Sequence, residues 1–378
     1  MITKKLAWGA LAAVALLAVG GCTAQTEEPT PLPPVPSPSA GEDPNAGPVQ
    51  PVGEPVTIVS GLSAPWSIAF LDGGSVLISE RDTALIKELT PAGDIREVAT
   101  VAGVRPGGEG GLLGLATLAD DEETWLYAYF TASGDNRIVR MPVDGEPGGY
   151  TLGAPEDVLT GLARAGNHNG GRIKFGPDGM LYATVGDAAQ GGRSQDLASL
   201  NGKILRMTPT GDVPSDNPFP DSLVYSLGHR NPQGLAWDAD GRLWAAEFGQ
   251  NTWDEVNHIE PGSNYGWPTV EGTSDNGAFV NPVYQWGTDE ASPSGLAFVR
   301  DTFFLAALRG ERVWVLYPDQ GPAGAVAYFQ GQYGRIRDVV AGPDGTLWMI
   351  TNNTDGRGQP REGDDRIIEV RLAPLVEG

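Results

Sequence analysis

The sequence predicts an all-β protein, specifically a six-bladed β-propeller of four-stranded antiparallel blades. An apolar strand, a turn and a second apolar strand recur six times, at intervals of about 40 to 60 residues, which is typical of propeller blades. The turn is often Asp-Gly, the strongest short signal for a β-hairpin. Little helical periodicity interrupts the repeats. A β-sandwich with repeated hairpins is the alternative, although sandwiches do not usually repeat one hairpin signature so evenly.

The six copies follow one another along the chain, and each is interpreted as the two inner strands of one blade. They are WSIAFLDGGSVLISERD, LLGLATLADDEETWLYAYFT, GRIKFGPDGMLYATVGD, QGLAWDADGRLWAAEFG, SGLAFVRDTFFLAALRG and RIRDVVAGPDGTLWMITNN.

Composition limits the class of protein. All-β folds often use as many residues as this chain of 378 in one domain. The 53 glycines and the apolar content of 40% indicate many turns around a real core. The formal charge of −23 argues against nucleic acid as a partner, because that affinity comes mostly from Lys and Arg.

The N-terminus has the pattern of an export signal. Lys4 and Lys5 precede an apolar run over residues 6–19, which is short for a membrane span and ends in Gly-Gly-Cys22. The small-small-Cys ending resembles a bacterial lipobox, so residues 1–22 are predicted to be a lipoprotein signal peptide. The mature protein would be exported and lipid-anchored through Cys22 at the outer face of the cell membrane. A plain secretion signal with an incidental cysteine is the alternative.

The segment after the signal predicts a spacer. Residues 23–53 are rich in Pro, Glu, Ser and Thr, with almost no apolar content, and are predicted to be a disordered linker. The propeller is expected over residues 54–378.

Polar residues precede the inner strands at matching positions. His168 stands seven residues before Phe175, and Arg230 stands seven before Trp237 in the next copy. The entrance to the first strand and the exit from the second lie on the same face of a propeller. These side chains should therefore converge on one mouth of the central channel, together with Glu109, Asn231, Ser292, Ser294, Arg335 and Arg337.

The arginines predict an anion site beside the imidazole. Arg230, Arg335 and Arg337, with Arg309 nearby, would present clustered guanidinium groups, which suit a ligand with several carboxylates. Taken singly, a histidine at a strand entrance more often bonds a turn, and an arginine at a blade edge more often pairs with a carboxylate. The joint pattern favours a ligand site.

Oxygen ligands follow the second strand of the fourth copy. Asp254, Glu255 and Asn251 lie in a glycine-containing stretch interpreted as a long loop. Ca²⁺ takes carboxylate and carbonyl oxygens in such loops, whereas no His/Cys cluster suits zinc.

These residues carry a family resemblance. LGHRNPQGLAWD followed by EFGQNTWDEVNHIEPGSNYGWP resembles the pyrroloquinoline quinone (PQQ) dependent soluble glucose dehydrogenases and the related aldose sugar dehydrogenases. GEGGLLG, NHNGGRIKFGPDG, QDLASLNGKILRM and GRIRDV lie in the family's order, and the resemblance covers about residues 54–373. It implies a six-bladed propeller that holds PQQ at the top of the channel.

The resemblance also implies roles for individual residues. His168 would be the catalytic base, Arg230 and Asn231 would contact the quinone, and Arg335 and Arg337 would hold PQQ and substrate. The carbonyls of Gly249 and Gln250 would bind the Ca²⁺ associated with PQQ. Glu255 and the carbonyl of Tyr265 would bind a second, structural Ca²⁺, and Asp254 belongs to the same metal-binding stretch.

Four positions depart from the family's pattern. Arg309 replaces a cofactor-binding lysine, Glu109 replaces a glutamine, Gln250 replaces a proline, and Asn167 replaces an aspartate that orients the histidine. The last change implies a weaker orienting group for His168.

The implied function is a quinoprotein oxidoreductase. Aldose sugars would be oxidised at C1 to lactones with PQQ and Ca²⁺, and electrons would pass to an external acceptor. Two alternatives are a Ca²⁺-dependent lactonase on a similar propeller, which has no use for a ring of arginines, and a non-catalytic lipoprotein that binds a sugar or peptide.

Overall fold

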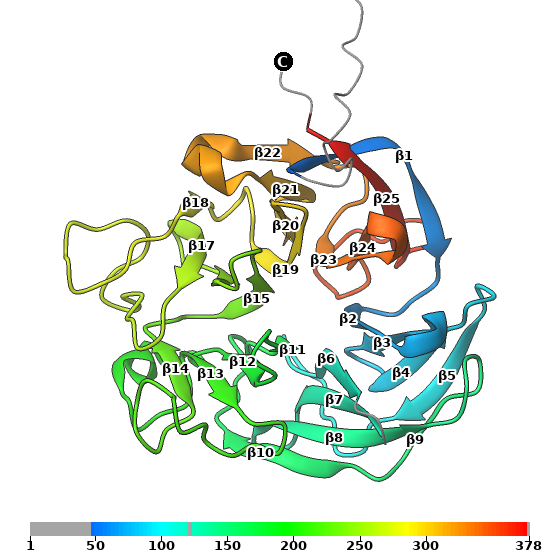
Figure 1. Ribbon diagram of the computed structural model, residues 1–378, viewed down its shortest axis with the longest axis horizontal. Helices are drawn as coiled ribbons and strands as arrows, with labels where there is room; N and C mark the ends of the chain where they lie inside the picture. Colours follow the sequence, from blue (N-terminus) through cyan, green and yellow to red (C-terminus); the bar gives the residue numbers. More distant parts are fainter. Residues whose placement is uncertain (1–46, 120–122, 376–378) are drawn as a thin grey trace, which may run out of the picture. The chain divides into compact units, whose positions relative to one another are not determined.

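The structure is a computed structural model and describes residues 47–119 and 123–375. Six antiparallel sheets are arranged in a ring, so the predicted six-bladed propeller is confirmed (Figure 1). Each predicted hairpin forms the two inner strands of one blade. The predicted signal peptide, with Cys22, lies outside the described residues.

Each of the first three blades is continuous in sequence. The first contains β2 (Pro65–Phe70), β3 (Val76–Glu80), β4 (Leu85–Leu89) and β5 (Ile95–Thr100). The second contains β6 (Leu112–Ala119), β7 (Thr124–Thr131), β8 (Asn136–Asp144) and β10 (Glu156–Leu162), and the short β9 (Thr151–Leu152) adds a fifth strand beside β8. The third contains β11 (Ile173–Phe175), β12 (Leu181–Val185), β13 (Lys203–Met207) and β14 (Val224–Leu227).

The remaining blades follow the same order, except that the last one combines both ends of the described chain. The fourth contains β15 (Pro232–Trp237), β16 (Leu243–Glu247), β17 (Trp253–Ile259) and β18 (Tyr284–Gly287). The fifth contains β19 (Pro293–Val299), β20 (Thr302–Ala307), β21 (Arg312–Leu316) and β22 (Ala325–Tyr328). The sixth contains β23 (Ile336–Ala341), β24 (Leu347–Thr351), β25 (Ile367–Pro374) and β1 (Val49–Val59).

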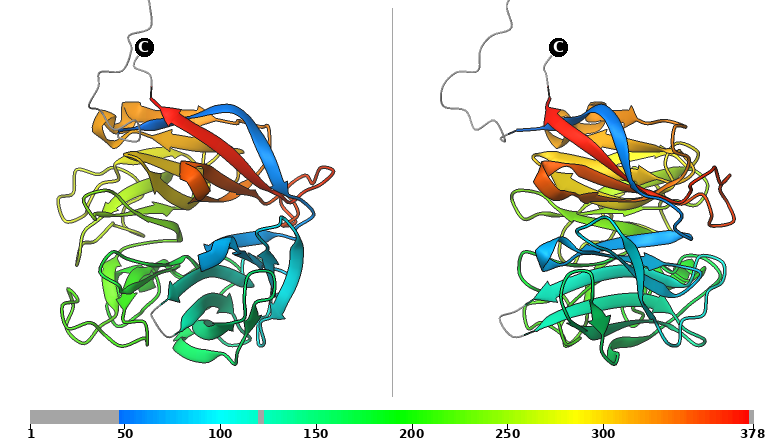
Figure 2. Two further views of the ribbon diagram at one scale, coloured as in Figure 1. Left: turned by 45° about the vertical axis from the view of Figure 1, so that its right-hand side comes forward. Right: turned by 90° about the vertical axis from the view of Figure 1, so that its right-hand side faces the viewer.

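Strand β1 closes the ring by pairing with β25, and both views in Figure 2 show the two strands side by side. The expected boundary near Glu54 is therefore wrong, because the ordered domain includes strand residues from Val49 onward. Val49 is fully buried. Proline is tolerated in edge strands, which explains why this segment resembles a linker in sequence.

The hydrophobic core is divided among the interfaces between blades. Six buried clusters are found in the described residues, and each joins two neighbouring blades, with Trp66 of the first blade added to the cluster between the second and third. Between the fifth and sixth blades, for example, Phe304 and Val313 meet Val339 and Leu347. A blade is therefore buried on both faces, which accounts for the nearly continuous apolar runs in its inner strands.

The inner strands approach one another closely around the axis. At Gly295 in β19, any Cβ atom would overlap the carboxylate of Asp338 in β23, so only glycine fits. Several residues at or just before the starts of the inner strands build the site described below. No helix within residues 47–119 and 123–375 has the length and apolar character required to cross a membrane.

Candidate active site

A cavity of about 360 Å³ lies where the inner strands begin. Some of its lining residues stand at or before the start of an inner strand, and others follow the second strand of a blade, as the blade topology requires. They are Trp66, Glu109, Gln233, Phe248, Ser292, Leu308, Arg309, Arg335, Arg337 and Arg357. Four arginines and one glutamate make this cavity electropositive in a strongly acidic chain.

His168 is held beside this cavity, in the loop before β11, with a left-handed backbone conformation (φ 56°). Its backbone N–H donates to Oε2 of the cavity residue Glu109 at 3.0 Å. Its Nδ1 lies 2.8 Å from Asp187 Oδ1, and the other oxygen of that carboxylate accepts a hydrogen bond from Trp267 Nε1 at 2.9 Å. Because Asp187 is only 1% exposed, the contact fixes the ring orientation and the proton on Nδ1.

The expectation of a weaker orienting group at His168 is wrong. The side chain of Asn167 has no hydrogen bond with any described residue, whereas Asp187 supplies the orienting carboxylate. Sequence reasoning missed Asp187, although it ends the quoted hairpin GRIKFGPDGMLYATVGD and stands at the exit of the second strand, on the predicted face.

Glu109 connects the histidine loop to the opposite side of the cavity. Its Oε1 accepts a hydrogen bond from Arg357 Nη1 at 3.0 Å, while its Oε2 holds the His168 loop. The Arg357 side chain is 49% exposed, so this pair lies at the rim. Arg357 was missed from the sequence because it lies in the loop after the last hairpin, where no strand pattern marks it.

Arg337 is the most deeply placed arginine of the cavity. Its Nη1 donates to Gln233 Oε1 at 2.9 Å, and its Nε and Nη2 donate to Asn352 Oδ1 at 3.2 and 3.0 Å. Burial lowers the pKa of Arg337 to about 9, although the charge of Asp355 opposes this shift. The carboxylate of Asp355 therefore balances the positive charge of the Arg337 guanidinium only in part.

Arg335 shares the Asp355 carboxylate. Its Nη2 lies 3.1 Å from Asp355 Oδ2, and its buried Nε has no hydrogen-bond partner among the described residues. Burial would raise the pKa of Asp355, but the charges of Arg335 and Arg337 outweigh it, and the pKa lies below its ordinary value. Arg309 is exposed at the edge of the cavity and forms no ion pair with the described residues.

Arg230 lies beside a smaller cavity, which shares Phe248 with the larger one. Its Nη1 donates to the carbonyl of Gly249 at 2.6 Å, its guanidinium lies 5.5 Å from the centre of a Trp267 ring, and its buried Nε has no described partner. The carbonyl expected to bind a metal therefore already faces a positive group.

Asn231 is buried, and its side chain bonds to the backbone of the loop that carries His168. Its side-chain oxygen accepts a hydrogen bond from the N–H of Gly170 at 3.0 Å, two residues after His168. The structure thus places Asn231 where it anchors the loop that carries His168.

Two carboxylates face each other in the smaller cavity. Glu247 and Glu255 are directly opposite in the β16–β17 pair, and burial followed by the charge of Glu247 raises the pKa of Glu255 to about 7. Like charges placed opposite each other are destabilising. Asn257 Oδ1 nearby is buried without a described partner, and Tyr265 lines the same cavity. This set of oxygens suits a hard cation.

Asp254 and Glu255 do not lie in a loop, as the sequence analysis expected, because both belong to strand β17. Successive strand residues point to opposite faces, so these two carboxylates cannot share one metal. Asp254 instead accepts hydrogen bonds from the backbone N–H groups of Gly249 (2.9 Å) and Ser292 (2.6 Å). Those bonds allow a carboxylate to be buried in a strand whose polar sequence suggests a loop.

No group of three or more His, Cys, Asp or Glu side chains within the described ranges has the arrangement of a metal site. A metal here would therefore depend on carbonyl and amide oxygens as well as carboxylates. Gln250 follows Gly249 in an exposed turn whose N–H groups surround Glu271.

A profile of the Glucose / Sorbosone dehydrogenase family matches residues 62–360. The chain belongs to this family. This chain is 32% identical to aldose sugar dehydrogenase YliI of Escherichia coli over 339 residues, which cover 78% of this chain and 89% of the relative. It is 27% identical to quinoprotein glucose dehydrogenase B of Acinetobacter calcoaceticus, covering 81% and 86% of the two chains.

Solved structures agree with this membership. The PQQ-bound form of aldose sugar dehydrogenase from Streptomyces coelicolor is 51% identical to this chain. The two structures superimpose with a TM-score of 0.81, and the match covers 87% of this chain and 99% of the other. The suspected resemblance to the PQQ-dependent glucose and aldose sugar dehydrogenases is therefore confirmed at the level of the family.

Proposed function

We propose that this protein is a quinoprotein dehydrogenase that oxidises aldose sugars at C1 to lactones. The observation that carries the proposal is the His168–Asp187 pair beside a cavity lined by four arginines. Family membership and the PQQ-bound relative support the class of enzyme.

His168 is the proposed general base. With its Nδ1 proton held by Asp187, the neutral imidazole keeps its lone pair on Nε2, which has no hydrogen bond with the described residues. That nitrogen can accept the proton of the anomeric hydroxyl. PQQ, when bound, supplies the acceptor for the C1 hydride. The proton and the hydride together account for the two electrons and two hydrogens that the sugar loses on becoming a lactone.

The arginines fit a planar tricarboxylate such as PQQ. Arg335 and Arg337 share a single carboxylate, Asp355, and Arg335 Nε is an unused buried donor. Within the described residues, Arg309 adds a guanidinium without an ion pair at the cavity edge, and Arg230 Nε is a second donor without a hydrogen bond. Forked guanidinium donors hold carboxylates well, so these four residues are proposed to bind the cofactor.

Ca²⁺ is proposed at two places. The carbonyls of Gly249 and Gln250 would hold the ion that accompanies PQQ and supplies Lewis-acid polarisation, once Arg230 releases Gly249. Glu255, with Glu247, Asn257 and the carbonyl of Tyr265, would hold a structural ion. The unfavourable Glu247–Glu255 pair and the orphaned Asn257 oxygen support the second site.

The protein is further proposed to pass electrons to an external acceptor, and to be exported to the outer face of the cell membrane with a lipid anchor at Cys22. The anchor rests on the sequence pattern of residues 1–22 alone. Replacing Cys22 with serine should release the protein from the membrane fraction. Retention of the Cys22→Ser variant would contradict the anchor without affecting the proposed chemistry.

The enzyme class is tested by reconstitution. Purified protein is incubated with PQQ and Ca²⁺, and a panel of aldoses is added with a redox dye. We expect quinone absorbance to accompany the protein and the dye to be reduced. Quinone uptake without turnover would favour a binding protein, and no uptake would favour the lactonase or a cofactor-free binder.

A further inference from the structure

A second cavity, of about 230 Å³, lies farther along the inner strands and shares no lining residue with the arginine-lined cavity. Ten of its fifteen lining residues have apolar side chains, contributed by all six inner strands. Its charged lining residues are Arg172, Lys174 and Asp338, so the lining carries a net charge of +1. We call it the Lys174 cavity.

Arg172 and Asp338 both line the Lys174 cavity, and Arg172 also bonds to Gln233, which lines the arginine-lined cavity. Arg172 Nη1 lies 2.7 Å from Asp338 Oδ2 and 3.2 Å from Ser67 Oγ, and Arg172 Nε donates to the Gln233 carbonyl at 3.0 Å. Both charged side chains are almost completely buried. Arg172 Nη2 has no hydrogen-bond partner in the described ranges. Asp338 thus forms its ion pair with Arg172, and within the described residues its charge reaches Lys174 only from a greater distance.

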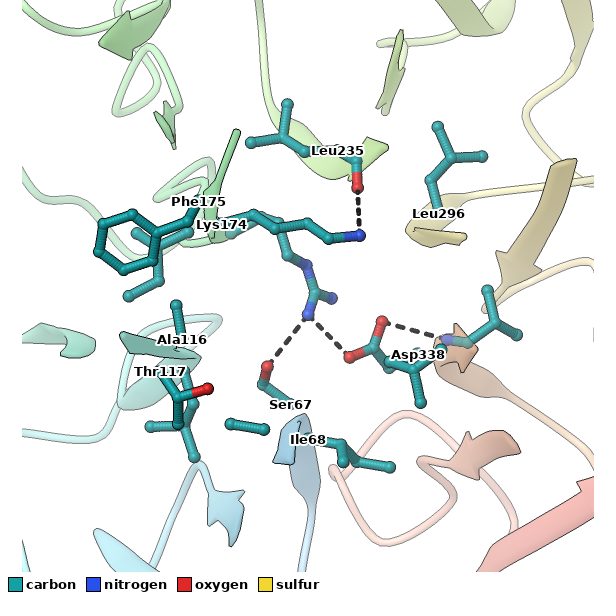
Figure 3. Close-up of a pocket in the computed structure, with 15 residues that line it drawn as sticks. Ser67, Ile68, Ala116, Thr117, Lys174, Phe175, Leu235, Leu296 and Asp338 are labelled. Atoms are coloured by element: carbon teal, nitrogen blue, oxygen red, sulfur yellow. Dashed lines mark hydrogen bonds and ion pairs between the residues drawn. The ribbon is translucent and has the colours of Figure 1, made fainter. Parts of the chain in front are cut away.

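Lys174 extends into the centre of the cavity, as Figure 3 shows. Its ammonium group has one described contact, a hydrogen bond of 3.5 Å to the carbonyl of Leu235, and no ion pair with the described residues. Surrounding protein lowers the pKa of Lys174 to about 8, although the charge of Asp338 opposes the shift.

Lys203 shows how this fold satisfies a buried lysine that has a structural role. Its ammonium donates three hydrogen bonds, of 2.7 to 3.1 Å, to the carbonyls of Arg193, Ser194 and Asn201. Among the described residues, Lys174 has only one acceptor, the carbonyl of Leu235, and that contact is long at 3.5 Å. The Lys174 side chain keeps solvent access within the cavity, so its ammonium group is free to meet an anion that enters between the apolar walls.

We propose that the Lys174 cavity binds a small organic monocarboxylate, with the carboxylate on Lys174 and the remainder of the ligand against the apolar walls. The net charge of +1 matches one negative charge, and the apolar majority of the lining favours an organic anion over an inorganic one. The site is independent of the proposed dehydrogenase chemistry.

The test uses benzoate and nuclear magnetic resonance of protein labelled with ¹³C in its lysine side chains. The chain has few lysines, so Lys174→Met assigns the Lys174 signal by its loss, and Lys174→Arg serves the same purpose if the first variant does not fold. We expect benzoate to shift this signal and to raise the pKa of Lys174 by about 1 or more, because a bound carboxylate favours the ammonium form.

The test follows the signals of single lysines, and not total benzoate binding, because the arginine-lined cavity also attracts benzoate. The signals of Lys87, which pairs with Glu80 at 2.8 Å, and of the satisfied Lys203 should not move. Benzyl alcohol, a neutral analogue, should leave the Lys174 signal unchanged. An unmoved Lys174 signal at saturating benzoate would overturn the proposal, and so would an equal shift with benzyl alcohol or with chloride.

Discussion

At the scale of single residues, the site depends on contacts that orient one imidazole. Asp187, itself fixed by Trp267, holds Nδ1 of His168, while Glu109 holds the backbone of the same residue. The sequence marks His168 through its position before an inner strand. It does not mark Asp187, because the partnership joins residues nineteen apart and exists only when the exit of β12 returns to the loop before β11.

Asp187→Asn should slow the chemical step without preventing cofactor binding. An amide can present its N–H to Nδ1 and stabilise the wrong tautomer, so we expect kcat to fall by about 10²- to 10⁴-fold. Steady-state kinetics with saturating PQQ measure this loss. Asn167→Ala is the matched control and should retain activity, since its side chain has no described hydrogen bond. A larger loss in Asn167→Ala than in Asp187→Asn would restore Asn167 as the orienting residue.

Lys174 should give folding a specific dependence on pH. Desolvation by the surrounding cavity walls lowers the pKa of Lys174 to about 8, from an ordinary value of 10.5, although the side chain keeps solvent access. Between these values the unfolded chain keeps a proton that the folded protein has released, so the contribution of Lys174 to stability rises with pH across this window. The Tm of the wild type minus that of Lys174→Met should therefore be more positive at pH 10 than at pH 7. An unchanged difference would contradict the lowered pKa.

At the scale of secondary-structure elements, hairpins are predictable and polar strands are not. The six inner hairpins were found from local turn signals and apolar runs. Strand β17 was mistaken for a loop because its buried carboxylates, Asp254 and Glu255, are stabilised by distant backbone groups that a sequence window cannot contain. The same strand brings Glu255 opposite Glu247, which creates the proposed structural cation site.

Ca²⁺ should stabilise this strand pair. A ligand that binds only the native state raises the free energy of unfolding by about 2.7 kcal/mol at a hundredfold excess over its Kd. Thermal unfolding should therefore show a higher Tm with Ca²⁺ and a lower one in chelator. Glu255→Gln should lose most of this response, whereas Glu156→Gln, in a surface pair with Arg140, should keep it. Identical curves in Ca²⁺ and chelator would count against the structural site.

At the scale of the whole molecule, closure of the ring depends on contacts between distant parts of the chain. The sequence predicts the number of blades because each hairpin is local, but it missed β1, whose partner β25 lies at the other end of the described chain. The interface clusters that β1 helps to complete hold the last blade against its neighbours.

Removing β1 should open the ring. A variant that starts at Ser60 loses the buried Val49 and Val59, and at about 1.5 to 3 kcal/mol for each buried valine it should be destabilised by at least about 3 kcal/mol. A variant that starts at Gly47 keeps β1 and should unfold like the full chain. Denaturant unfolding compares the two. Equal midpoints would show that β1 is dispensable.

The central claim, that His168 performs base catalysis on an aldose beside bound PQQ, is tested most directly by single-turnover reduction of the quinone. Wild-type protein and His168→Gln are loaded with PQQ and Ca²⁺ and mixed with excess aldose, and the quinone absorbance is followed. We predict that both proteins bind PQQ, and that reduction in the variant is slower by about 10²- to 10⁴-fold. Equal rates in the two loaded proteins would contradict the account and leave His168 as a turn-stabilising residue.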